Sequence, residues 1–325
     1  MERIGRISRV ERSQFTVLYE GTEYPAMLRG CFFEPETERP VVGDYVNVTL
    51  IGSDIIVESI CPRKSVLRRA DQSGHAAGFV KTMQEQVMVA NFDYIFILVS
   101  LNDNYNLNRI ARYVSITLEG GGIPVVLLTK ADLCPDPTPY LSEVAALSPS
   151  VRVHALSTYT GDGLDALTEY LRPGVTAALL GSSGVGKSTL LNHLAGHEIM
   201  KTGEIRAEDS KGRHTTTHRQ LFDLNGVTVI DTPGMRELGL IDAEEGVSGT
   251  FSDIEALTAQ CRFRDCAHKS EPGCAVRQAL QDGTLSQKRW ELYLSMMNES
   301  RFNSRQKAIA IQRKRLNKSA YRRKG

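Results

Sequence analysis

The segment that most constrains the fold of this chain is a short glycine-rich loop between a strand-like and a helix-like stretch. Residues 181–188 read Gly-Ser-Ser-Gly-Val-Gly-Lys-Ser, which is a complete G-x-x-x-x-G-K-[ST] pattern. The apolar run 175–180 precedes the loop and the helical stretch 189–194 follows it, and in this context the pattern binds phosphate. Glycines allow backbone N–H groups to surround an anion, and the start of the helix adds its positive end. The loop therefore predicts an α/β domain that binds a nucleotide.

This loop supplies most of the predicted nucleotide contacts. Lys187 is expected to reach the β- and γ-phosphates, and the Ser188 hydroxyl is expected to hold Mg²⁺. The residues expected to contact the nucleotide from this loop are Gly181, Ser182, Ser183, Gly184, Val185, Gly186, Lys187, Ser188 and Thr189.

The pattern around the loop extends the α/β prediction to residues 84–247. Strand-length apolar runs alternate with helical segments, which is typical of a mostly parallel sheet covered by helices on both faces. The runs lie at 94–99, 125–128, 151–155, 175–180 and 227–230, and the helical segments at 107–118 and 164–171.

The two flanking regions have different patterns. Residues 1–65 contain short β-rich runs at 15–19, 45–50 and 55–57, separated by turn residues, which predicts a small β-barrel of the oligonucleotide-binding (OB) type. An SH3-like barrel fits these runs equally well. Residues 66–83 contain few large apolar side chains and are predicted to be a linker. Residues 248–325 lack a strand pattern, and Trp290, Tyr293, Leu294 and Met297 have the spacing of one helical face.

Two further elements suit a nucleotide-dependent switch. Asp231-Thr-Pro-Gly234 follows an apolar strand and fits a D-x-x-G motif, in which Asp231 reaches Mg²⁺ through water and the Gly234 N–H contacts the γ-phosphate. Residues 212–218, Gly-Arg-His-Thr-Thr-Thr-His, fit a second switch loop with a threonine for Mg²⁺. Thr216 is the preferred ligand, with Thr215 and Thr217 as alternatives; an exposed loop without a chemical role is the other reading.

The motif that would select guanine lies in an unusual place. Thr129-Lys130-Ala131-Asp132 fits [NT]-K-x-D, whose carboxylate accepts hydrogen bonds from guanine, but it precedes the phosphate loop instead of following it. A second guanine-loop candidate, Ala155-Leu-Ser157, is also upstream. Two displaced elements in the correct mutual order favour a circularly permuted GTPase over a P-loop ATPase or kinase, for which Asp132 would have no use.

A Cys/His cluster occurs in the C-terminal region. Cys261, Cys266, His268 and Cys274 fall within 14 residues. In a reducing compartment such a cluster indicates a metal more often than disulfides, and three thiolates with one imidazole form a closed, structural zinc set. Reduced core cysteines are the alternative.

Charge is distributed unevenly along a chain whose net charge is only +1. Ten of the 39 basic residues lie in residues 301–325, which contain no acidic residue, so the first 300 residues hold 29 basic and 38 acidic side chains. An acidic body with a basic tail suggests a polyanionic partner such as nucleic acid, and a solvated helix end is the alternative.

The order of these elements resembles the RsgA (YjeQ/YloQ) family of circularly permuted GTPases that depend on the small ribosomal subunit. The resemblance includes Gly43-Asp44, Pro62-Arg-Lys64 and the Cys/His cluster. It implies a GTP hydrolase that acts as a late assembly factor of the small (30S) subunit and binds 16S rRNA near the decoding region. It would leave after GTP hydrolysis, with one structural Zn²⁺ per chain and Mg²⁺ with GTP. A scaffold that binds RNA without turnover is a competing hypothesis, against which the complete phosphate motifs argue.

The position after the D-x-x-G motif bears on catalysis. Met235 stands where Ras-like enzymes carry a glutamine that orients water, so slow intrinsic hydrolysis is expected. His214 is a candidate for that role, and an exposed histidine without one is the alternative. No apolar run approaches the ~20 residues of a membrane helix, and the charged N-terminus lacks a signal peptide's apolar core, so a cytoplasmic protein is expected. The chain is also expected to be a monomer.

Overall fold

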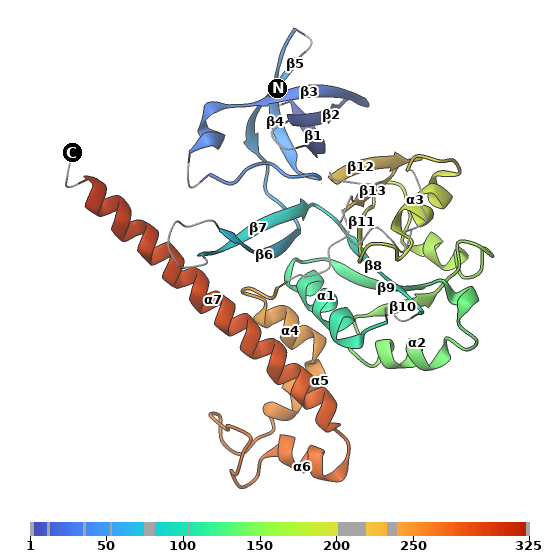
Figure 1. The fold of residues 1–325 in the computed structure, drawn as a ribbon, viewed down its shortest axis with the longest axis vertical. Helices are drawn as coiled ribbons and strands as arrows, with labels where there is room; N and C mark the ends of the chain where they lie inside the picture. The colour runs from blue at the N-terminus through green and yellow to red at the C-terminus, as the bar shows by residue number, and fades with distance from the viewer. Residues whose placement is uncertain are drawn as a thin grey trace, which may run out of the picture.

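The computed structural model describes residues 3–11, 14–34, 37–52, 54–74, 82–102, 105–200, 219–232 and 239–322. Figure 1 shows the N-terminal barrel at one end, the α/β domain beside it, and a long C-terminal helix that runs along one side of the molecule. Within these ranges, no helix is both long and apolar enough to cross a membrane.

The N-terminal strands close into a barrel. They are β1 (Ile4–Glu11), β2 (Gln14–Tyr19), β3 (Thr22–Leu28), β4 (Tyr45–Ile51) and β5 (Asp54–Ile60). Their order is β1-β2-β3-β5-β4, and β4 pairs back to β1. Alternate residues such as Val46, Val48, Ile55 and Val57 point inward, and the 3-10 turn η1 (Gly30–Phe33) adds the buried Phe32. This confirms the OB-type barrel that the β-rich runs predicted.

The α/β domain is built on a mostly parallel sheet. Its strands are β8 (Tyr94–Ser100), β9 (Ile123–Thr129), β10 (Arg152–Ala155), β11 (Thr176–Leu180), β12 (Arg219–Leu224) and β13 (Val227–Asp231), in the order β10-β9-β8-β11-β13-β12. Every pairing is parallel except that of β12 with β13.

Both faces of this sheet are covered, because alternate strand residues enter two different cores. On one face Ile95 and Ile97 pack with α1 (Leu107–Glu119) and the C-terminal helices. On the other face Phe96 and Leu98 pack with α3 (Lys187–Ala195) and the turn η3 (Asp165–Glu169), which is a 3-10 turn where a longer helix was expected. The remaining elements are α2 (Thr138–Ala145) and η2 (Ala131–Leu133).

The barrel and the α/β sheet are joined by backbone hydrogen bonds. Strand β1 pairs antiparallel with β12, with Arg9 opposite Gln220 and Val10 opposite Arg219. The Arg6 guanidinium bonds the Thr176 hydroxyl at 2.9 Å and the Thr228 hydroxyl at 3.2 Å across the same junction.

The structure differs from the expected linker at residues 66–83. Residues Val66–Gly74 form β6, which pairs with β7 (Thr82–Ala90) as a separate two-stranded sheet. The sequence pattern did not reveal this strand because two consecutive arginines follow its buried Leu67 and interrupt the apolar run. Arg68 is exposed and Arg69 is half-buried, and the pairing register shifts between Leu67 and Arg68.

The C-terminal region is helical, as predicted. It contains α4 (Glu244–Thr250), α5 (Ser252–Thr258), α6 (Ala275–Asp282) and α7 (Gln287–Arg322). The 36 residues of α7 span about 54 Å at the rise of an α-helix. Trp290, Tyr293 and Met297 are buried, but Leu294 is exposed and Met296 takes its place in the core.

Candidate functional site

The predicted nucleotide motifs meet at one edge of the sheet. Thr129, Ala155, Leu180 and Asp231 are the last residues of β9, β10, β11 and β13, which run parallel. The loops that follow therefore emerge on the same side, where open α/β sheets bind ligands. Motifs that lie as much as 102 residues apart in the chain are brought together in this way.

The phosphate loop has the close packing that its glycines predict. A Cβ on Gly181 would lie 2.7 Å from the Leu98 carbonyl oxygen, so no larger residue fits beside β8. Gly184 and Gly186 have φ angles of 78° and 99°, which other residues rarely adopt. Helix α3 begins at Lys187, so its positive end faces the loop.

The Lys187 ammonium is folded into this loop. Its Nζ donates to the Gly181 carbonyl at 2.8 Å and to the Ser182 carbonyl at 2.9 Å. Burial lowers the pKa of Lys187, and the charge of Asp231 opposes that effect. The loop therefore holds a cation among neutral carbonyls, an arrangement that an anionic phosphate would stabilise.

Asp231 is the most perturbed carboxyl at this edge. Its side chain is 3% exposed, and burial raises its pKa to about 6, while Lys187 acts in the opposite direction. Among the described residues, no hydrogen-bond partner lies near its Oδ1 atom. A buried carboxylate oxygen without a partner fits a water-bound Mg²⁺, which would supply the missing charge and hydrogen bond. The next residue anchors the strand end, since the Thr232 hydroxyl donates to the Leu179 carbonyl at 2.5 Å.

The predicted guanine motif contacts the phosphate loop directly. The Thr129 hydroxyl donates to the Val185 carbonyl at 2.7 Å, so this side chain positions the loop. Lys130 has a left-handed backbone with φ of 58°, and Asp132 lies exposed in the turn that follows. The Asp132 carboxylate is therefore accessible to the guanine base of a bound nucleotide.

The second guanine loop lies beside the first. The Ala131 N–H donates to the Leu156 carbonyl at 3.2 Å, which ties the two loops together. The Ser157 hydroxyl accepts from the backbone N–H groups of Tyr159 and Thr160, at 3.1 and 3.2 Å. Ser157 is buried, and its side chain is therefore used to shape its own loop.

Other predicted site residues can be placed only in part. Ser182 and Val185 are buried, Ser188 is half-buried, and Ser183 and Thr189 are exposed. His214, Thr216 and Gly234, together with Met235, lie outside the described residues.

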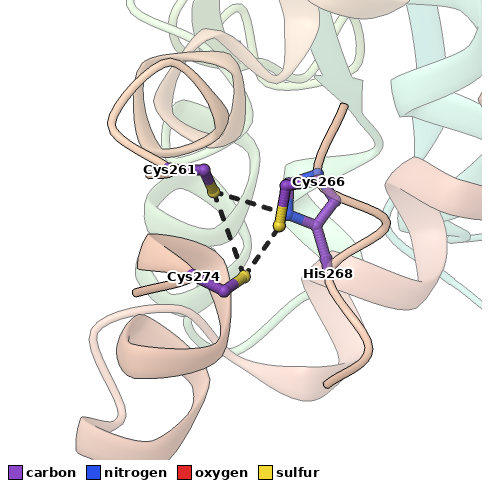
Figure 2. A group of neighbouring side chains, drawn as sticks. All are labelled: Cys261, Cys266, His268 and Cys274. Atoms are coloured by element: carbon purple, nitrogen blue, oxygen red, sulfur yellow. Dashed lines mark hydrogen bonds between the residues drawn. The ribbon is translucent and has the colours of Figure 1, made fainter. Parts of the chain in front are cut away.

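The Cys/His cluster assembles as a compact ligand set (Figure 2). One ligand atom from each of Cys261, Cys266, His268 and Cys274 lies within 4.8 Å of all the others. Cys261 Sγ is 3.9 Å from Cys274 Sγ, and His268 Nδ1 is 3.6 and 3.5 Å from these two sulfurs. A tetrahedral site with Zn–S bonds of ~2.3 Å has edges of about 3.8 Å, so these distances fit zinc.

Local structure explains how the four ligands converge. Cys274 caps α6, accepting the Arg277 N–H, and His268 has a left-handed backbone with φ of 59° that turns its ring toward the sulfurs. The His268 ring packs edge-on to Trp290 of α7 with centroids 5.5 Å apart. The Cys/His cluster is therefore packed against the start of the long helix.

Comparisons with known proteins agree with this geometry. The model of the RsgA GTPase family matches residues 60–241, and that of the 50S ribosome-binding GTPase family matches residues 176–314. The small ribosomal subunit biogenesis GTPase RsgA 2 of Listeria monocytogenes is 43% identical over 312 residues, covering 95% of this chain and 87% of the relative. RsgA of Methanosarcina acetivorans is 42% identical over 322 residues, covering 98% of this chain and 84% of the relative.

Solved structures give the same result. YjeQ from Thermotoga maritima superposes with a TM-score of 0.65 and 28% identity, over 92% of this chain and 98% of its own. The circularly permuted GTPase YloQ superposes with a TM-score of 0.64 and 25% identity, over 94% and 96%. Together with the permuted order of the motifs around Lys187 and Asp231, these matches show that this chain belongs to the RsgA family of circularly permuted GTP hydrolases.

Proposed function

We propose that this GTPase is a late assembly factor of the small (30S) ribosomal subunit. In this proposal it binds 16S rRNA near the decoding region, hydrolyses GTP when the subunit stimulates it, and then dissociates. The observation that carries the proposal is a GTP site, permuted in order, placed between an OB-type barrel and a Cys/His module. The relatives' printed names, small ribosomal subunit biogenesis GTPase, support the choice of subunit.

We propose a division of the chain into four parts. Residues 1–65 form the barrel, 84–247 the GTPase domain and 248–325 the zinc-binding domain with the basic end. Residues 66–83 act as the connection between the first two. We propose a cytoplasmic monomer whose barrel and basic end both contact rRNA.

In the nucleotide site, Lys187 would leave its two carbonyl partners to bind the β- and γ-phosphates, and Ser188 and Thr216 would hold Mg²⁺. Asp231 would orient a water on that ion, and Gly234 would contact the γ-phosphate through its N–H group. Thr129 and Asp132, with Lys130, Ala131 and Ser157 around them, form the guanine pocket. Bound Mg²⁺ neutralises charge on the phosphates.

We assign to His214 the role of positioning the attacking water, because the Met235 side chain cannot orient a water by hydrogen bonding. Slow hydrolysis by the free protein follows from this assignment, with stimulation by the subunit. Zinc at Cys261, Cys266, His268 and Cys274 has a structural role, because the four ligands leave no open position.

The experiment is GTP turnover measured alone, with purified small subunits and with purified large subunits. ATP is the control nucleotide, and Lys187→Ala is the control for contaminating hydrolases. The proposal expects stimulation by small subunits only, and no turnover of ATP. Equal rates with both subunits, or a rate indifferent to ribosomes, would refute it.

A further inference from the structure

The chain that leaves the D-x-x-G motif is held by one face of helix α7. Leu240, six positions after Gly234, donates its N–H to Glu299 Oε1 at 3.1 Å and accepts at its carbonyl from Asn303 Nδ2 at 2.6 Å. The next residues are held in the same way, with the Asp242 N–H on Ser304 Oγ at 2.9 Å and the Ala243 N–H on Ser300 Oγ at 3.0 Å.

A charge pair completes this contact. Lys307 Nζ lies 2.6 Å from Asp242 Oδ2, and Asp242 has a left-handed backbone with φ of 45°. Positions 299, 300, 303, 304 and 307 share one helical face, so a single side of α7 holds residues 240–243. This face is called the α7 clamp below.

The centre of the clamp is buried. Leu240 and Ser300 have no exposed surface, and Asn303 is 6% exposed. Losing a buried hydrogen bond costs more free energy than losing an exposed one, because water cannot replace the lost partner of a buried polar group. The position of residues 240–243 is therefore tied to the position of α7.

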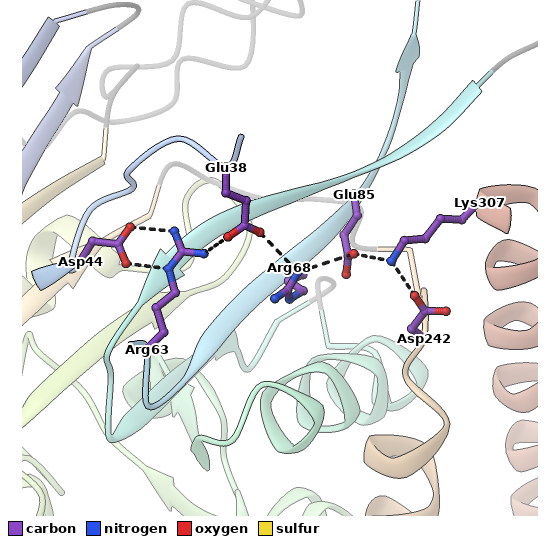
Figure 3. A network of polar contacts seen from close by, with 7 residues as sticks. All are labelled: Glu38, Asp44, Arg63, Arg68, Glu85, Asp242 and Lys307. Atoms are coloured by element: carbon purple, nitrogen blue, oxygen red, sulfur yellow. Dashed lines mark hydrogen bonds and ion pairs between the residues drawn. The ribbon is translucent and has the colours of Figure 1, made fainter. Parts of the chain in front are cut away.

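Helix α7 is itself fixed at two other places. Near its start Trp290 packs against the zinc-ligand candidate His268, and Lys307 Nζ also lies 2.5 Å from Glu85 Oε2 of β7. Figure 3 shows that this pair continues a row of charges across the hairpin to the barrel. Its members are Lys307, Glu85, Arg68, Glu38, Arg63 and Asp44.

We propose that the α7 clamp is a positioning element of the GTPase reaction, which anchors the segment after the D-x-x-G motif and thereby sets the preference for GTP over GDP. In the proposed site the Gly234 N–H contacts the γ-phosphate, which GDP lacks, so an anchor for the chain beyond Gly234 would favour GTP. Releasing the anchor leaves GTP to order a looser segment, and that entropy cost weakens GTP binding while GDP binding is unchanged. The inference rests on the γ-phosphate contact proposed for Gly234, and it is independent of the proposed role on the ribosome.

The test compares Asn303→Ala and Lys307→Met with the control Asn298→Ala in the full chain without ribosomes. Asn298 lies on the opposite, exposed face of the same helix, so its loss leaves the clamp intact. The readouts are the Kd values for a non-hydrolysable GTP analogue and for GDP, together with kcat and KM for GTP. Lys307→Met removes only partly exposed ion pairs and guards against a variant that fails to fold.

Both clamp variants are expected to bind the GTP analogue about fivefold more weakly, the effect of one ordinary hydrogen bond, with GDP affinity within twofold. Asn298→Ala is expected to match the wild type. A lower fraction of folded protein would change both nucleotides equally, so an unchanged ratio of the two Kd values in both clamp variants overturns the proposal. Because ribosomes are absent, failure of the proposed function on the small subunit leaves this result unaffected.

Discussion

Replacing Asp231 with asparagine should make the nucleotide-free protein more stable at neutral pH while removing its activity. The carboxyl is buried next to Lys187, and one of its oxygens has no partner among the described residues. An uncharged amide of the same shape removes the buried charge. It also removes the carboxylate proposed to act on Mg²⁺, so GTP hydrolysis should fall.

The magnitude follows from the pKa. Burial raises the pKa of Asp231 from 3.8 to about 6, so the folded protein holds this proton more tightly than the unfolded chain does. Ionisation therefore lowers the free energy of unfolding as the pH rises from about 4 to about 6, by about 3 kcal/mol in total. Between pH 5.0 and pH 7.5 the loss amounts to about 1.4 kcal/mol. The Asp231→Asn variant would lack this loss, because an amide does not titrate.

The assay is urea denaturation of wild type and Asp231→Asn at both pH values, without nucleotide or Mg²⁺. The stability difference between the two proteins should shift in favour of the variant by about 1.4 kcal/mol on going to pH 7.5. The exposed Asp165→Asn is the control substitution. If the difference in free energy of unfolding between the two proteins is the same at both pH values, then folding does not raise the pKa of Asp231 and the reasoning is wrong.

Three further predictions concern the base, the metal and the basic end. Asp132→Asn should lower GTP affinity roughly 10- to 150-fold and raise the preference for xanthosine nucleotides, because an amide donates where a carboxylate accepts; unchanged GTP affinity would exclude Asp132 as the guanine contact. Cys274→Ala should lose one equivalent of zinc, measured by metal analysis. It should also bind the small subunit equally well with a GTP analogue and with GDP; if the wild-type difference in affinity persists, the Cys/His cluster does not transmit the nucleotide state. Removing residues 312–325 spares the α7 clamp and should weaken subunit binding most at low salt, with nucleotide affinity unchanged; equal binding across a salt titration would exclude the basic end as an RNA contact.

Several features could be predicted because a local pattern determines them. The phosphate loop needs glycine at Gly184 and Gly186 for their positive φ angles, and a strand and a helix must flank it. The permutation was visible because the order of motifs is a property of the chain itself. The Cys/His set was visible because all four ligands lie close together in sequence and converge in space.

Other features depend on contacts that no local pattern records. Strand β6 carries two consecutive arginines, Arg68 and Arg69, and its pairing with β7 becomes evident only when Leu67 is seen in the core. The ten basic residues of the C-terminal segment also looked uncompensated. In the structure Arg301 pairs with Glu244, and Lys307 pairs with Glu85 and Asp242, all from outside that segment.

The Thr129 side chain illustrates the same limit within the site. Thr129 belongs to the [NT]-K-x-D motif predicted to contact the nucleotide, and the motif gave no sign that its hydroxyl would also donate to the phosphate loop at Val185. A residue's partner is determined by which strands are neighbours. In this sheet the order β9-β8-β11 sets those neighbours, and it follows from long-range packing.

The pairing of β1 with β12 determines how the barrel can be used in binding. A barrel on a flexible linker could occupy many positions relative to the basic helix. It could then bind at the same time as that helix to partners whose two sites lie at many different distances, because the linker keeps its effective concentration high. Here the β1–β12 ladder and the three hydrogen bonds from Arg6 to Asn91, Thr176 and Thr228 fix the barrel against the α/β sheet. Both surfaces can be engaged together only by a partner that presents its two sites at one separation and one orientation. A partner whose two sites have the same chemistry but a different separation can bind only the barrel or only the basic helix. The rigid junction therefore makes binding selective for the shape of the partner.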